Sequence, residues 1–254
     1  MGDDPEGCAL NADPQDQLTL LEVQRHDLEI DRARHRRATL PEAARVAALE
    51  STAKALDDNI TRAAVEVSDL EAEQRKADAD VDLVRQRAEK DKTLLETIND
   101  AKQLTNLQHE LESLARRQAE LEDVELEVME RLEAAQKSHV ALLAERDTVA
   151  ADLAEAQVAR DNALADLADE EGIAAAARTA AAERVPAELL GLYDKLRADN
   201  AGIGAAALHQ GRCEGCRIEL TPVDLGRIRE APPTEVIRCE ECRRILVRTA
   251  ESGL

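Results

Sequence analysis

Aromatic residues are almost missing from this sequence. Its 254 residues include a single tyrosine, Tyr193, and neither phenylalanine nor tryptophan. Large globular cores draw much of their buried area from aromatic side chains, so one compact domain of enzyme type is not expected. In their place, Ala, Glu, Leu, Lys and Arg supply 143 residues. This composition is typical of long helices and coiled coils.

Cysteines, targeting signals and long apolar runs are also scarce. No cysteine lies between residues 9 and 212, whereas a disulfide-bonded secreted domain would spread its cysteines through a shorter chain. The acidic N-terminus lacks the basic and apolar regions of a signal peptide. The apolar runs fall short of the roughly 18 residues that cross a membrane. These observations predict a soluble cytoplasmic protein without a membrane contact.

A heptad pattern begins at residue 46 and continues for more than seven repeats. Fourteen of its sixteen positions are apolar, a pattern that predicts a left-handed coiled coil. The positions are Val46, Leu49, Ala53, Leu56, Ile60, Ala63, Val67, Leu70, Gln74, Ala77, Val81, Val84, Ala88, Asp91, Leu95 and Ile98. We call this set the first seam.

A second seam runs from Leu104 to Leu167 and mixes apolar with polar positions. One heptad position is apolar in nine successive repeats, namely Leu107, Leu114, Leu121, Val128, Ala135, Leu142, Val149, Ala156 and Ala163. The other position holds Leu104, Leu111, Gln118, Glu125, Leu132, His139, Arg146, Leu153, Arg160 and Leu167. Polar residues in a seam weaken it but specify register and partner.

Turn signals separate the two seams. Asn99 is suited to ending one helix in a left-handed conformation, and Asp100 with Gln103 resembles a capping box that opens the next. The similar seam lengths favour an antiparallel hairpin, with one continuous rod that dimerises in parallel as the alternative. We therefore predict a mainly α protein. It comprises a disordered leader at 1–14, a helical hairpin at 15–184 with a kink near 40–41 and a turn near 97–103, a linking helix and hinge at 185–204, and a C-terminal module at 205–254.

The C-terminal module contains two CxxC pairs. Cys213 and Cys216 are separated from Cys239 and Cys242 by 22 residues. Two such pairs are typical of a structural zinc site in which four thiolates form a tetrahedron. A redox dithiol and an iron–sulfur cluster are the alternatives, and the two pairs beside short predicted strands favour one structural Zn²⁺ ion. A complete four-thiolate set leaves no ligand position for His209.

Short elements are expected around these cysteines. Alternating patterns predict strands at 217–220, 235–238 and 244–248. Thr221 followed by Pro222 predicts the start of a short helix that extends to about Arg229. A knuckle, helix, strand and second knuckle together make a zinc ribbon.

The sequence resembles a bacterial family, the four-cysteine zinc-ribbon proteins with an N-terminal coiled-coil hairpin. The resemblance covers nearly the whole chain, and the ribbon motif is its most specific part. The family typically has glycine directly after the last cysteine, where this chain has Arg243. The matching stretches are Leu40-Pro41, Asn99-Asp-Ala-Lys102, Leu107-Gln-His-Glu110, Leu121-Glu-Asp123, Val185-Pro186, Tyr193-Asp-Lys-Leu-Arg197, Cys213-Glu-Gly-Cys216 and Cys239-Glu-Glu-Cys242-Arg-Arg-Ile-Leu246.

The resemblance implies a hairpin that carries a ribbon and has no catalytic activity. Lysine is scarce relative to arginine, and this composition resembles that of a member from a high-GC actinobacterium. Relatives are linked to flagellar gene control, secretion components, a sigma factor and RNA. Because an actinobacterial member would lack flagella, the flagellar role is not expected to transfer.

Three function classes can be compared on the residues themselves. A protein–protein adaptor, as monomer or homodimer, fits the long seams and the terminal module. Nucleic-acid binding through the ribbon is the alternative, with Arg238, Arg243, Arg244 and Arg248 as candidate contacts. The ribbon is formally neutral, however, and the rest of the chain carries the net charge of −21, which would repel a phosphate backbone. An enzyme is least expected, because the sequence contains no phosphate-binding glycine loop, G-x-S-x-G or H-E-x-x-H motif.

Overall fold

The computed structural model describes residues 10–254 and divides the chain into two compact units. The first, here called the ribbon unit, contains the described residues up to Pro41 together with Ala159–Leu254. The second, here called the hairpin unit, is Glu42–Val158. Within residues 10–254, no helix is both long and apolar enough to span a membrane.

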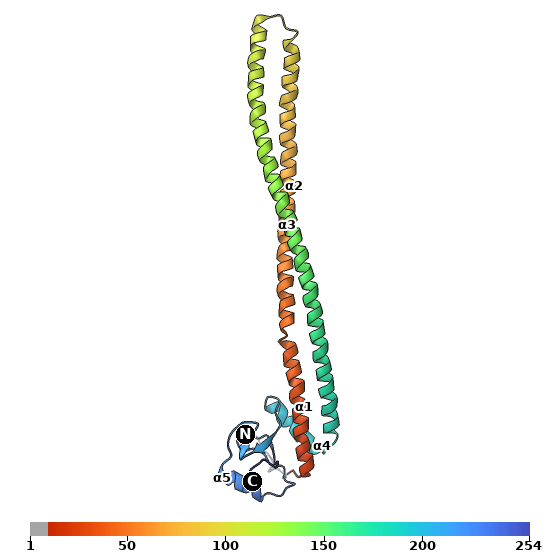
Figure 1. Ribbon diagram of the computed structural model, residues 1–254. Coiled ribbons are helices and arrows are strands. Elements are labelled where there is room, and N and C mark those ends of the chain that lie inside the picture. The colour runs from red at the N-terminus through yellow and green to blue at the C-terminus, as the bar shows by residue number, and fades with distance from the viewer. Residues whose placement is uncertain (1–9) are drawn as a thin grey trace, which may run out of the picture. The chain divides into compact units, whose positions relative to one another are not determined.

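The hairpin unit consists of two antiparallel helices. It contains most of α2 (Pro41–Leu95) and the first part of α3 (Ala101–Ala182), which lie side by side in Figure 1. Ion pairs between the helices show the direction. Asp57 pairs with Arg146 at 2.7 Å, and Arg87, further along α2, pairs with the earlier residue Glu110 at 3.0 Å. The predicted hairpin is therefore confirmed, in preference to a parallel rod.

Both predicted seams are the buried faces of these helices. Every position of the first seam is buried or half-buried, and so is every position of the second. Leu70 of α2 and Leu132 and Ala135 of α3 form one buried cluster across the pair. The polar seam residue Asp91 is 3% exposed and accepts a hydrogen bond from Arg87 at 3.0 Å. A charged seam position is thus tolerated because it is paired.

The turn between the helices spans residues 96–100. The Asp100 carboxylate accepts hydrogen bonds from the backbone N–H groups of Lys102 (3.0 Å) and Gln103 (2.9 Å), so Asp100 caps α3 as predicted. The expectation for Asn99 is wrong. Among the described residues other than glycine, positive φ angles occur only after residue 200. The N–H of Thr97 instead bonds to the carbonyl of Leu94 at 3.0 Å, and this tight final turn satisfies a helix-end carbonyl.

The helices of the ribbon unit that precede its sheet are α1 (Pro14–Ala38), the end of α3 and α4 (Ala187–Asp199). Asp13 caps α1 by accepting a hydrogen bond from the Gln15 N–H at 2.8 Å. A break at residues 39–40 separates α1 from α2, where a kink was expected. α1 and the end of α3 are antiparallel, since Asp27 contacts Arg178 whereas Arg36 contacts Glu170.

Two predicted boundaries differ from the structure. Residues 1–9 of the expected disordered leader lie outside the described residues. Residues 10–12 are ordered, because the Leu10 carbonyl accepts from Val236 and the Ala12 N–H donates to Thr234. The expected hinge after α4 is also held in place. The Gln24 side chain donates to the carbonyl of Gly202 and accepts from the N–H of Gly204.

The ribbon contains a small mixed sheet with the strand order β2-β1-β3. β1 (Ala205–His209) pairs antiparallel with β2 (Arg212–Cys213) and parallel with β3 (Ile245–Val247). The two residues between β1 and β2, Gln210 and Gly211, both have positive φ, as a tight hairpin turn requires. The helix α5 (Pro222–Glu230) follows, capped by Thr221 as expected. β3 lies within the strand predicted at 244–248, whereas β1 and β2 were not predicted. The strands predicted at 217–220 and 235–238 are wrong, because these segments form only isolated bridges, at Glu219, Glu235 and Arg238.

Candidate metal centre

Four cysteines from two separate parts of the ribbon come together. Their Sγ atoms all lie within 4.8 Å of one another. Cys213 and Cys216 follow the turn after β1, while Cys239 and Cys242 precede β3. Cys213 and Cys239 are buried, and Cys216 and Cys242 are half-buried. Cys8 lies outside the described residues.

The two CxxC loops have the same backbone geometry. In the first, the Cys213 carbonyl accepts a hydrogen bond from Arg217 (2.7 Å), and in the second the Cys239 carbonyl accepts one from Arg243 (2.8 Å). Arg217 and Arg243 have φ angles of 62° and 63°. Glycine adopts this left-handed conformation without steric cost. In this chain the turn forms with arginine at both positions.

The sulfur geometry fits a tetrahedral zinc ion. Zinc–thiolate bonds of about 2.3 Å place the sulfurs of a regular tetrahedron about 3.8 Å apart. The Sγ atoms of Cys213 and Cys242 are 3.9 Å apart, and so are those of Cys216 and Cys239. His209 does not belong to the cluster. Its ring lies near Glu214 and Glu251, at 3.9 and 3.6 Å.

The surroundings shift the pKa values of Cys213, Cys239 and Cys242 in different directions. Burial raises the pKa of Cys213, and it raises the pKa of Cys239 to about 12. Burial also opposes ionisation of Cys242, but hydrogen bonds from Arg244 and the neighbouring cysteines outweigh it and lower its pKa to about 7. Several thiolates at this spacing would repel one another without a cation between them. A divalent metal ion supplies the compensating charge.

The ribbon packs around these cysteines and against the helices. Its own core joins Cys213 and Cys239 to apolar residues of β1, α5 and β3, including Leu208, Ile228 and Leu246. A second core contains Ile245 and Val247 on the ribbon side. On the helix side it contains Leu20 and Val23 of α1, Ala181 and Ala182 of α3, and Leu189, Tyr193 and Leu196 of α4. The metal-binding loops therefore belong to a module fixed to α1 and α4.

The four arginines proposed as nucleic-acid contacts have different environments. Arg244 donates to the carbonyls of Ile203 and Asn200. Arg248 donates to the carbonyls of Ala231, Pro232, Pro233 and Glu235 at 2.8–3.1 Å. Arg238 donates to the carbonyl of Arg243, and the Arg243 side chain lies 3.8 Å from Glu240. Three of the four guanidinium groups thus donate to the protein's own backbone carbonyls, and the fourth lies near an acidic side chain.

A buried polar network that the sequence pattern did not predict holds α1, α3 and α4 together. Asp27 is 4% exposed and accepts a 2.6 Å hydrogen bond from the Tyr193 hydroxyl. Arg178 and Arg197 approach the same carboxylate at 3.4 and 3.5 Å. Burial, followed by the hydrogen bond to Asp27, raises the pKa of Tyr193, so the hydroxyl stays a donor. Asp27 gave no sequence signal, since its partners lie more than 150 positions away.

The fold and the cysteine cluster define a helical hairpin protein with a C4-type zinc ribbon. Residues 23–201 match the family described as CT398-like coiled coil hairpin domain, and residues 212–246 match the C4-type zinc ribbon domain. The chain belongs to the CT398-like coiled-coil hairpin family.

Relatives match the chain over most of its length. A protein of Mycobacterium tuberculosis strain H37Rv is 39% identical over 233 residues, covering 91% of this chain and 95% of that protein. A Mycobacterium leprae protein is 30% identical over 218 residues, with 85% and 93% covered. These mycobacterial relatives agree with the expected actinobacterial resemblance.

Solved structures show the same architecture. One from Mycobacterium smegmatis is 37% identical and has a TM-score of 0.81, covering 94% of this chain and all of that one. The structure of CT398 from Chlamydia trachomatis is 15% identical, with a TM-score of 0.68 and coverage of 92% and 98%. At that identity the similarity shows the fold alone.

Proposed function

We propose that this protein is a non-enzymatic, zinc-binding adaptor of the cytoplasm that binds protein partners along its helices. One Zn²⁺ ion held by Cys213, Cys216, Cys239 and Cys242 stabilises the ribbon. Four thiolates leave no open position for a catalytic water, so the zinc has a structural role. A reducing compartment keeps such thiols available for the metal.

The adaptor proposal rests mainly on two pairs of exposed apolar side chains on one face of α3 in the hairpin unit, separated by one heptad that holds Glu133 and Gln136 at the same positions. Leu126, Met129, Val140 and Leu143 are 58%, 43%, 63% and 42% exposed on α3. Their spacing places Leu126 and Val140, and likewise Met129 and Leu143, two heptads apart on one helix face. We call these four residues the outer stripe. All of them lie outside the second seam, whose own apolar positions pack against α2. Apolar side chains grouped on one exposed face are typical of interaction surfaces.

Nucleic-acid binding through the ribbon receives less support. Arg244 and Arg248 are engaged with backbone carbonyls, and the ribbon has no aromatic side chain on which a base could stack. The acidic hairpin would also repel phosphates. We therefore keep this function as an outcome of the experiment and not as a second proposal.

Affinity capture with a stripe variant tests the adaptor function. The full chain and a Leu126→Glu/Leu143→Glu variant are used to capture proteins from native lysate of the source organism, with and without nuclease. We expect defined proteins to remain bound at about 0.5 M salt, where exposed charge interactions are screened. The stripe variant should recover about tenfold less, since charge replaces the buried apolar contact.

A matched control carries Val65→Glu and Leu83→Glu, which place the same charge at exposed apolar positions of α2. It should capture the same proteins as the unaltered chain. If capture disappears on nuclease treatment, the nucleic-acid alternative replaces the adaptor function. If no protein survives the salt wash, the adaptor function is wrong.

A further inference from the structure

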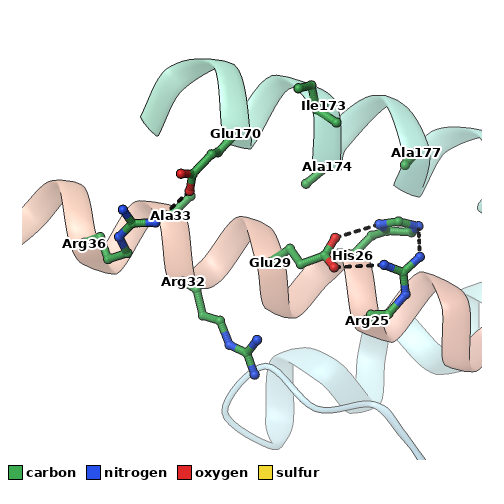
Figure 2. A pocket seen from close by; sticks show the side chains of 10 residues that line it. All are labelled: Arg25, His26, Glu29, Arg32, Ala33, Arg36, Glu170, Ile173, Ala174 and Ala177. Carbon is green, nitrogen blue, oxygen red and sulfur yellow. Dashed lines mark hydrogen bonds and ion pairs between the residues drawn. The ribbon is translucent and has the colours of Figure 1, made fainter. Parts of the chain in front are cut away.

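A groove of about 490 Å³ lies in the ribbon unit between α1 and the end of α3. Figure 2 shows α1 and α3 on its two sides, with Ala174 and Ala177 of α3 toward α1. Ala33 and Ala174 are 4% and 6% exposed, whereas Ile173 beside them is 74% exposed. Small side chains thus form the floor, next to a large apolar side chain that this unit leaves in solvent.

Arginines line the α1 side of this groove. Arg25, Arg32 and Arg36 are among its lining residues, and their spacing of seven and four places them along one face of the helix. The lining acids are Glu29 and Glu170. Glu29 contacts Arg25 and His26, each at 2.9 Å, and Glu170 contacts Arg36 at 2.7 Å. The acidic groups of the groove are therefore already paired.

We propose that this groove binds an acidic amphipathic helix of a partner protein. The apolar face of that helix would lie on the alanine floor beside Ile173, and its carboxylates would face Arg25, Arg32 and Arg36. The inference rests on the adaptor function above and adds to it the chemistry of one partner surface.

The charge of the groove supports an acidic partner. The chain has a net charge of −21, yet here three arginines face two acids. Within residues 10–254, Arg32 makes no hydrogen bond or ion pair. Arg25 and Arg36 are 60% and 62% exposed, and exposed ion pairs of this kind contribute little stability. An incoming carboxylate can therefore pair with Arg32 and share the other two.

The dimensions of the groove support a helix as the binding element. From Arg25 to Arg36, α1 advances about 16 Å, or three helical turns. Two antiparallel helices present a continuous furrow into which a third helix can pack through residues spaced three and four apart. The helix would cover Ile173 over this length.

Other occupants fit these features less well. Nucleic acid would gain the arginine contacts but would leave the apolar floor and Ile173 unsatisfied. Small-molecule pockets bury most of their ligand's surface. Here the wall residues Arg25, Arg36 and Ile173 are each more than half exposed, so a small molecule in the groove would remain largely exposed to solvent.

Titration with a defined peptide tests the inference. The probe is a synthetic helical peptide of three to five turns with leucines on one face and glutamates on both flanks, labelled for fluorescence anisotropy. Its twin carries lysine in place of every glutamate. We expect the full zinc-loaded chain to bind the acidic peptide at least about tenfold more tightly than the twin, and to lose this preference as salt is raised.

Substitutions in the groove test whether the peptide binds there. Arg25→Glu/Arg32→Glu should weaken binding of the acidic peptide about tenfold, while Arg45→Glu/Arg75→Glu makes the same charge change at exposed positions of α2 and should not. Likewise, Ile173→Asp should weaken binding, whereas Val158→Asp, at an apolar position of α3 that is 61% exposed, should not. Circular dichroism of every variant shows whether the helices remain folded.

Each result decides the question. The inference is overturned if the two peptides bind equally, if the groove variants bind like their controls, or if single-stranded RNA displaces the acidic peptide through the same arginines. If the peptide does not bind but the outer stripe still captures proteins, the inference about the groove is wrong and the adaptor function stands. If no protein is captured at high salt but the peptide still binds in the groove, the proposal that the outer stripe binds partners is wrong and the groove inference stands.

Discussion

The hairpin unit and the ribbon unit stabilise their folds in different ways. In the hairpin unit, burial is spread over a repeating row of side chains, such as Val46, Ala53, Leu56 and Leu70, each 3–5% exposed. In the ribbon unit it is concentrated, with Leu20, Val23, Tyr193, Leu208 and Ile245 fully covered. The four cysteine sulfurs and the buried Asp27 carboxylate add polar interactions at two sites in this unit. A change in the hairpin unit should therefore have a local and moderate effect, whereas loss of the metal should affect a whole module.

Removal of the metal should produce the largest difference between the units. Zinc supplies on the order of 10 kcal/mol to the folding of small zinc domains, and the ribbon core is built around Cys213 and Cys239. A strong chelator, or Cys239→Ser, should make residues 205–254 susceptible to limited proteolysis while residues 42–158 stay resistant and helical.

Mass spectrometry of the fragments and circular dichroism measure this result. Protection of the ribbon in the chelated protein would show that the thiols serve no structural metal. A complete loss of helicity would show that the hairpin unit depends on the ribbon.

Within the hairpin unit, position in the seam should decide the cost of a mutation. Leu70→Ala should lower the free energy of unfolding by about 2 to 3 kcal/mol, because a buried leucine leaves a cavity. The control Leu83→Ala, at a side chain that is 67% exposed, should cost less than about 0.5 kcal/mol. Urea denaturation followed by circular dichroism compares the two. Equal costs would contradict the assigned seam.

In the ribbon unit, removal of the single hydroxyl of Tyr193 should measurably lower the free energy of unfolding. Tyr193→Phe keeps the ring but leaves the buried Asp27 carboxylate without its 2.6 Å donor, which should cost about 1 to 2 kcal/mol. Amide hydrogen exchange should increase in α1 and α4 and stay unchanged in residues 60–140. Unchanged exchange in α1 would mean that the two arginines satisfy Asp27 without the tyrosine.

The smallest expected effect is stabilising. Because Arg243 has a φ of 63°, Arg243→Gly should relieve a left-handed conformation that is unfavourable for other residues, a gain of about 1 kcal/mol. Arg212→Gly is the control, at a strand residue where glycine should destabilise. Denaturation of the ribbon at a fixed free zinc concentration measures both. A destabilised Arg243→Gly variant would contradict the strain explanation.

The comparison also explains which features the sequence could predict. The seams depend on spacing along one helix, so the sixteen positions from Val46 to Ile98 could be identified by counting. The CxxC pairs likewise follow from short spacing. The strand β1 could not be predicted in this way. Its sequence is Ala205-Ala-Ala-Leu-His209, and alanine and leucine favour helix; its strand conformation comes from pairing with β3.

Long-range contacts account for the remaining differences. Nothing local indicates that Gln24 would bond to Gly202 and Gly204, or that Arg248 would bond to the carbonyls around Pro232. The same holds for residues 10–12, whose composition suggested disorder but whose backbone pairs with Thr234 and Val236. Each of these contacts joins segments that are far apart in the chain or depends on a loop geometry that the fold imposes.

Native mass spectrometry of the freshly purified chain, combined with elemental analysis, tests the zinc assignment most directly. We predict one zinc ion per chain, lost when any one of the four cysteines is changed to serine and retained when Cys8 is changed instead. A chain that folds its ribbon without bound zinc, or that carries an iron–sulfur cluster there, would contradict the account.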